Sequence, residues 1–298
     1  MPFRYWMLIV LLAAGWGSSF FFNEILLREL GPMWVALGRV GIGALGCWAW
    51  LFATRANLKI STALLWTMIA FGLFQYALPL AIYPLTQQYI TSSAAGIVNA
   101  MTPVMVVIVS HFWPGGEQAT WSKGIGVILG FAGIVILALP SFAGQGPSDP
   151  VALILTILAP LCYGIALNLL RMLDGVDRVL LTAWSATIGA VMLAPVAVGL
   201  EGIPTITKAE TWGALLMIGL VLTSAAFILL YWLVPKIGGT NASTITFLAP
   251  ISSVLLGVFI LSEVILPVQY VGMAIIFSGL LFIDGRLLKR LGFSQPNG

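Results

Sequence analysis

Long apolar runs alternate with short polar connections along the whole chain. About ten of these runs are long enough to cross ~30 Å of hydrocarbon. Backbone polar groups in lipid must be satisfied within the segment, so we expect every run to be a helix. The connections are too short to hold a soluble domain. The expected spans are residues 5–22, 33–53, 63–85, 89–112, 122–139, 150–170, 179–200, 212–234, 242–261 and 267–284.

A repeated set of residues divides this pattern into two halves. In each half a Glu is followed by Gly residues 9 and 16 positions later, and a Pro precedes it. Five spans per half is an odd number, so the second half enters the membrane from the other side. We therefore expect an all-α polytopic membrane protein of ten helices, built as inverted five-helix repeats (1–142 and 143–290) with a tail at 291–298. The matching residues are Pro103, Glu117, Gly126 and Gly133 in the first half and Pro250, Glu263, Gly272 and Gly279 in the second.

Composition supports lipid as the solvent, because 60% of residues are hydrophobic and only 8% are charged. A soluble domain carries about 25% charged residues. If both termini are cytoplasmic, ten of the 13 Lys and Arg residues lie inside and two outside. This distribution is a strong positive-inside signal. The net charge of +3 is therefore explained by basic loop residues that hold the membrane topology, and no nucleic-acid partner is expected.

Polar and aromatic residues share faces on several spans. Polar groups in hydrocarbon are costly, so mid-span ones should face another helix or a cavity. Hydroxyls can instead bond to their own helix, and Pro79 is more readily explained as a kink former that frees a carbonyl. Taken together, the faces predict a central chamber for a small-molecule substrate. Its expected lining is Trp16, Ser19, Asn23, Gln75, Tyr76, Pro79, Tyr83, Asn99, Tyr163, Phe227, Tyr231, Ser243 and Thr246.

Charged residues are scarce in the middle of the spans. No Asp or Glu falls at the centre of any run, and His111 is near the end of one. Proton-driven carriers place such groups in a relay, so we expect no obligatory proton coupling and a neutral or zwitterionic substrate. Arg39 is the one deep charge. It is either a structural residue bonded to carbonyls or a contact for a substrate carboxylate.

Catalysis within the membrane would need a nucleophile with a base, paired carboxylates or metal ligands. The single His and the apolar surroundings of Cys47 and Cys162 offer no such group, so we expect no enzyme, cofactor or metal site. The glycines of the fifth and tenth spans suit close helix packing. They are equally compatible with a homodimer face.

The residues Trp16-Gly17-Ser18-Ser19, the Gly31-Pro32 pair followed by Arg39, and the doubled Pro–Glu–Gly–Gly set resemble the EamA branch of the drug/metabolite transporter superfamily. The resemblance covers essentially the whole chain. It departs from the family pattern at residues 113–116, where Trp-Pro-Gly-Gly precedes the Glu.

The resemblance implies a ten-helix carrier of the bacterial inner membrane that exports amino acids or other small metabolites by alternating access. The aromatic interior makes the exporters of aromatic amino acids the most similar subgroup. A multidrug exporter for lipophilic cations, within the same superfamily, is the alternative. The inverted repeat disfavours a channel or scaffold, neither of which needs that symmetry.

Overall fold

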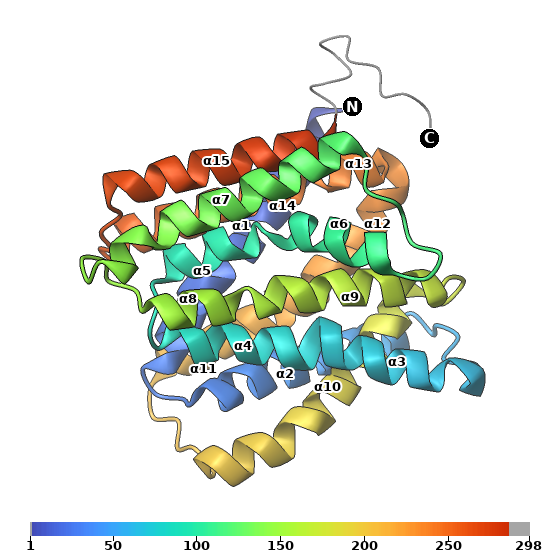
Figure 1. The fold of residues 1–298 in the computed structure, drawn as a ribbon. Helices are drawn as coiled ribbons and strands as arrows, with labels where there is room; N and C mark the ends of the chain where they lie inside the picture. The colour runs from blue at the N-terminus through green and yellow to red at the C-terminus, as the bar shows by residue number, and fades with distance from the viewer. Residues whose placement is uncertain (1, 286–298) are drawn as a thin grey trace.

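The structure is a computed structural model that describes residues 2–285, apart from the side chains of residues 239 and 240. The predicted tail at 291–298 and the basic residues Arg286, Lys289 and Arg290 lie outside this range. All regular structure in the described residues is helical (Figure 1). The expected all-α polytopic fold is therefore confirmed.

Nine helical segments of the described chain are long and apolar enough to cross a membrane. A tenth, α14, is apolar but shorter, and the one-turn helix α13 (Gly239–Ala242) precedes it. Each lies within a few residues of an expected span. The ten spans in order are α1 (Phe3–Leu27), α2 (Pro32–Ala53), η1–α3–η2–α4 (Thr62–Leu64, Leu65–Gly72, Leu73–Ala77, Leu78–Gln87), α5–α6 (Ser92–Asn99, Thr102–Phe112), α7 (Trp121–Phe142), α8–α9 (Pro150–Thr156, Leu158–Met172), α10 (Arg178–Glu201), α11–η3–α12 (Ala209–Leu216, Met217–Ala225, Ala226–Ile237), α14 (Thr244–Phe259) and α15 (Pro267–Asp284).

The third and eighth spans each contain a π-helical segment, η2 and η3. A π turn shifts hydrogen bonds to the fifth residue back and is frequent at functional sites. The two segments occupy equivalent positions in the two halves. The fourth span is interrupted between Asn99 and Thr102, where Pro103 falls in the first turn of α6 and cannot donate a hydrogen bond.

Glycines bring α7 and α15 into backbone contact along one edge of the molecule (Figure 1). A Cβ added to Gly133 would lie 2.7 Å from the carbonyl oxygen of Gly272, and one on Gly279 would lie 2.7 Å from that of Gly126. No side chain fits such a distance without a backbone shift. These glycine faces therefore pair within one chain, and a subunit contact is not needed to explain them.

Basic residues mark one end of the bundle, which we call the basic end. The other end, called the opposite end, holds the α1–α2 loop, the end of α10 and the α14–α15 loop. The described residues that define the basic end lie at or next to helix ends, and they are Arg4, Arg55, Lys59, Lys123, Arg171, Arg178 and Lys236.

Two carboxylates at the opposite end join helices from different halves of the chain. Glu29 accepts hydrogen bonds from the hydroxyls of Thr207 and Thr211, each at 2.5 Å, at the start of α11. These bonds, the one from Thr207 first, lower the pKa of Glu29 to about 2. Glu201, the last residue of α10, accepts from the Met33 backbone N–H at 2.9 Å and caps α2.

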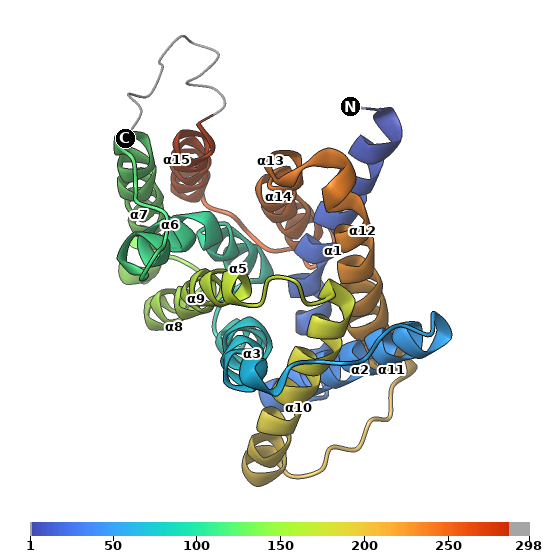
Figure 2. The same cartoon turned by 90° about the vertical axis from the view of Figure 1, so that its right-hand side faces the viewer.

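Six spans form two lobes that face one another (Figure 2). The first lobe contains the third, fourth and sixth spans, where α9 packs on α4 and α6. The second contains the first, eighth and ninth spans, where α1 packs on α14, α11 and α12. Each span of one lobe corresponds in the sequence repeat to a span of the other.

Candidate substrate-binding site

Arg39 projects from α2 toward the second lobe. Its Nε donates to Thr223 Oγ1 at 3.3 Å, and its Nη2 donates to Ser19 Oγ at 3.2 Å. The Thr223 hydroxyl in turn donates to the carbonyl of Ile218, five residues back, as the π turn of η3 permits. The structural alternative for Arg39 assumed carbonyl partners, and the partners are instead two hydroxyl groups.

An aromatic cluster lies one helical turn from these hydroxyls. The Trp16 ring lies 5.4 Å from Phe227, which stacks on Tyr231 at 5.8 Å and meets Tyr76 of the first lobe at 6.2 Å. Trp16 Nε1 donates to the Leu222 carbonyl at 3.0 Å, which fixes the indole against η3. Aromatic pairs at these spacings stabilise the cluster and leave ring faces for an apolar ligand.

Tyr83 and Asn99 supply polar groups from the first lobe. The Tyr83 hydroxyl donates to Asn99 Oδ1 at 2.7 Å, and its ring packs edge-on against Phe20 of α1 at 5.1 Å. Asn99 stays partly accessible beside the break in the fourth span. The phenols of Tyr83 and Tyr163 both lie within electrostatic range of Arg39. Both lobes therefore bring polar groups toward the guanidinium.

At the opposite end, side chains bond directly across the two lobes. Asn23 Nδ2 of α1 donates to Gln87 Oε1 of α4 at 2.8 Å, and Gln87 Nε2 donates to the Phe20 carbonyl at 2.9 Å. Ser253 of α14 donates to the Ser92 carbonyl at 3.0 Å. All three side chains in these bonds are buried, so they close the opposite end.

Glu263 adds to this closure from the loop after α14. Its Oε1 accepts from the Ser92 backbone N–H at 2.7 Å, and its Oε2 accepts from the Ser93 N–H at 2.9 Å and the Ser93 hydroxyl at 2.5 Å. The carboxylate thus caps α5, a helix of the other half. A negative charge at this position is also favoured by the positive end of the helix dipole. A cavity of about 470 Å³ at this end is lined partly by Glu24, Gln87 and Glu263.

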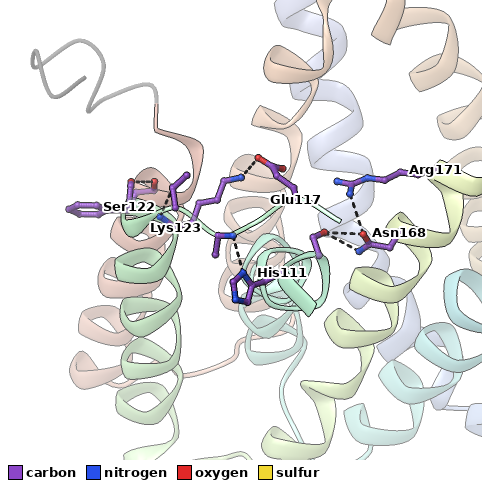
Figure 3. A network of polar contacts seen from close by, with 10 residues as sticks. His111, Glu117, Ser122, Lys123, Asn168 and Arg171 are labelled. Carbon is purple, nitrogen blue, oxygen red and sulfur yellow. Dashed lines mark hydrogen bonds and ion pairs between the residues drawn. The ribbon is translucent and has the colours of Figure 1, made fainter. Parts of the chain in front are cut away.

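Near the basic end the polar contacts drawn in Figure 3 stay within the first lobe, within a loop and its neighbouring helix, or between α7 and α15. Ser110 and Asn168 bond between α6 and α9 at 3.0 Å, and Arg171 donates to the same Asn168 at 3.3 Å. Glu117, the counterpart of Glu263, pairs with Lys123. The His111 ring accepts from the Ala119 backbone N–H at 3.1 Å, so it anchors a loop.

The packing of the fourth span also differs between the two ends of the bundle. In the fourth span, α5 packs on α14 and α1 of the second lobe, whereas α6 packs on α9, α7 and α15. Figure 2 shows α6, α7 and α9 on one side and α1, α12 and α14 on the other. The lobes are therefore joined at the opposite end.

The structure places eight of the predicted lining residues in two neighbouring groups, one around Arg39 and one around Phe227, and the other five lie elsewhere. Asn23 is bonded in the closed end, Gln75 lies on η2 beside Tyr76, and Pro79 is buried at the start of α4. Ser243 and Thr246 lie at the start of α14, where the Thr246 hydroxyl bonds back to the Ser243 carbonyl at 2.6 Å. The eight are Trp16, Ser19, Tyr76, Tyr83, Asn99, Tyr163, Phe227 and Tyr231.

Two residues of this region were not among the predicted lining residues. Thr223 holds Arg39, and its place four residues before Phe227 on the same helical face was a usable signal. Phe20 packs on Tyr83 but carries no polar group that would separate it from any other buried aromatic residue.

Comparison with known proteins places this geometry in a family. The profile of the EamA-like transporter family matches residues 4–139 and again residues 150–284. The chain is 24% identical over 284 residues to the uncharacterized transporter YoaV of Bacillus subtilis, covering 94% of each protein. It is also 24% identical over 285 residues to an uncharacterized transporter of Archaeoglobus fulgidus, covering 93% of this chain and 98% of the other. A solved crystal structure superposes with a TM-score of 0.68 at 19% identity, covering 96% of this chain and 98% of that chain, and so shows the same fold. Because the family profile spans nearly the whole multi-pass chain, the protein belongs to the EamA-like transporter family.

Proposed function

We propose that the protein is an inner-membrane carrier that exports amino acids, above all aromatic or other large neutral ones, and related small metabolites. The observation that carries this proposal is the juxtaposition of Arg39, Tyr83 and Asn99 with the cluster around Phe227. One region thus offers hydrogen-bonding groups for polar ends of a solute and ring faces for an apolar side chain.

Alternating access is the proposed mechanism. The equivalent lobes are bonded together at one end only among the contacts described above, by Asn23, Gln87 and Glu263. Exchanging the conformations of two inverted repeats would release these contacts and form equivalent ones at the basic end. With both termini in the cytoplasm, the basic end faces the cytoplasm, and the arrangement described corresponds to an inward-facing state.

Transport is proposed to run without obligatory proton coupling. The acidic residues Glu24 and Glu263 line the cavity at the opposite end, away from Arg39 and the aromatic cluster. A carboxylate relay at mid-membrane is therefore not part of the mechanism. Purified protein in liposomes should exchange solute at the same rate with and without a pH gradient. Exchange that occurs only with the gradient would overturn this part of the proposal.

A lipophilic-cation exporter is the second candidate, because the stacked rings of Phe227 and Tyr231 could hold a cation through their faces. Counterflow of tryptophan, threonine and a quaternary ammonium dye in liposomes separates the two functions. We expect tryptophan to exchange fastest and Trp16→Ala to slow it. Trp66→Ala is the matched control, because Trp66 is 78% exposed near the start of the third span. Dye exchange without tryptophan exchange would favour the second candidate.

A further inference from the structure

Arg39 carries a charge that the described residues do not neutralise. It lies seven residues into α2, about 10 Å from the start of the helix and therefore within the hydrocarbon. The ion pairs found among residues 2–285 do not include it. Its two hydrogen-bond partners, Thr223 and Ser19, are neutral hydroxyls. A cation at this depth is costly unless an anion or water accompanies it.

Arg39 is not fully enclosed by the residues that hold it. The residue is partly exposed, whereas Ser19 and Thr223, which hold it from the second lobe, are 3% and 1% exposed. A guanidinium has five N–H groups, of which two are used on these hydroxyls. The remaining N–H groups are those of Nη1 and one of Nη2, which form one edge of the planar group. That edge has the geometry that binds a carboxylate through two parallel hydrogen bonds.

The surroundings match a solute with a carboxylate at one end and an apolar group at the other. Thr223 precedes Phe227 by four residues and Trp16 precedes Ser19 by three, so the aromatic cluster begins one helical turn from the two hydroxyl residues that hold the guanidinium. One turn is about 5.4 Å, which is close to the reach of an aromatic amino-acid side chain. The Tyr83 and Tyr163 phenols of the first lobe lie within electrostatic range of the same charge.

We propose that Arg39 binds the carboxylate of the transported solute while the cluster of Trp16, Phe227 and Tyr231 holds its apolar group. This inference deepens the proposed amino-acid transport and rests on it for the choice of solute. It assigns the substrate class as organic acids and zwitterions with a free carboxylate, and it excludes amines and quaternary ammonium ions that lack one. Arg39 thus determines specificity, while Ser19 and Thr223 position it.

Ligand-induced thermal stabilisation of the purified protein in detergent tests the proposal with three related probes. Phenylalanine and 3-phenylpropionate carry the carboxylate, whereas phenethylamine does not. We expect the two carboxylates to raise the melting temperature of the wild-type protein and phenethylamine to leave it unchanged. Arg39→Gln should weaken carboxylate binding about 10- to 100-fold, because a charge-assisted hydrogen-bond pair is lost. Arg39→Lys should lie between, since it keeps the charge without the planar edge.

The ligand-free protein gives an independent readout. If Arg39 serves the solute, Arg39→Gln removes a buried charge that the protein alone does not neutralise, and the melting temperature stays equal or rises. If Arg39 is instead a structural residue, Arg39→Gln lowers the melting temperature of the ligand-free protein. Arg55→Gln is the control, because Arg55 is an exposed basic residue in the α2–η1 loop. Ser19→Ala frees the guanidinium and should weaken carboxylate binding less than Arg39→Gln does.

The results separate this inference from the proposed function. Equal stabilisation by phenethylamine and phenylalanine, no stabilisation by any carboxylate, or undiminished carboxylate binding by Arg39→Gln would overturn the role of Arg39. Carboxylate binding that depends on Arg39, without exchange of any amino acid in liposomes, would instead overturn the proposed transport and leave the binding site standing.

Discussion

Glu263 offers a direct test of how the opposite end is held closed. Its carboxylate accepts three hydrogen bonds, two from backbone N–H groups of α5, and Ser92 and Ser93 are 0% and 1% exposed. Hydrogen bonds to a charged group contribute about 1.5–3 kcal/mol each, and water from the adjoining cavity replaces part of what Glu263→Ala removes. We therefore expect a net loss of about 2 kcal/mol from the closed arrangement.

This loss should appear as a change in population. If the three bonds form only when the opposite end is closed, about 2 kcal/mol raises the ratio of open to closed molecules about 30-fold. The reporter is Asn99→Cys, which lies inside the closed layer, in a chain whose buried Cys47 and Cys162 are replaced by Ala. A membrane-impermeant thiol reagent added at the opposite end should label this cysteine about 30 times faster in Glu263→Ala.

Two comparisons make the assay decisive. Glu263→Gln keeps one carbonyl acceptor, so its labelling rate should lie between those of the wild type and Glu263→Ala. Glu210→Gln is the control, because Glu210 is 55% exposed at the same end and pairs loosely with Lys208 at 4.0 Å. Labelling that is the same in Glu263→Ala, Glu210→Gln and the wild type would show that Glu263 does not hold the lobes together.

Three further predictions concern the glycine contacts, the Glu29 cap and the counterpart of Glu263. Gly133→Ala should lower the melting temperature by an amount equivalent to about 1–3 kcal/mol, because the new methyl group overpacks the contact with α15. Gly124→Ala in the same helix, with no atom within 4 Å of its new Cβ, should be neutral or stabilising. Equal effects of the two substitutions on the melting temperature would contradict the glycine contact. Hydrogen bonds from Thr207 and its neighbours lower the pKa of Glu29 to about 2 from an ordinary 4.5, so its stabilisation is complete above pH 4.5 and is lost as the pH falls toward 2. The difference in melting temperature between wild type and Glu29→Gln should narrow over that range, and a constant difference would refute the assignment. Glu117→Gln should slow the labelling of Asn99→Cys, because Glu117 makes only an exposed ion pair in the described state but would take the place of Glu263 in the exchanged one; an unchanged labelling rate would contradict that equivalence.

The number and limits of the spans could be predicted because lipid leaves the backbone no alternative to helix. The π-helical segments η2 and η3 could not, because their residues are ordinary helix formers. The Leu222 carbonyl in η3 is bonded to Trp16, which is 206 residues away in sequence. The spacing of residues along one helix carries no information about contacts between residues so far apart in the sequence.

The site was only partly predictable for a related reason. Trp16, Tyr83 and Asn99 could be chosen because aromatic and amide groups on helical faces need partners, and they do contact the site. Ser243 and Thr246 are the sequence counterparts of residues on α5, but the two halves are packed differently. An internal repeat fits the described arrangement and the arrangement with the halves exchanged equally well. The sequence therefore could not show which half would supply residues to the candidate site.

The glycine pairing of α7 with α15 also bears on how the protein is made. Chains insert from the amino terminus as they leave the ribosome, so α7 enters the bilayer well before α15 has been translated. Until then its flat face, where Gly126 and Gly133 lie, has no partner from its own chain. A product truncated before residue 267 would keep this face bare and available to quality-control proteases or to other nascent chains. The last helix of the described chain therefore completes the first half as well as the second.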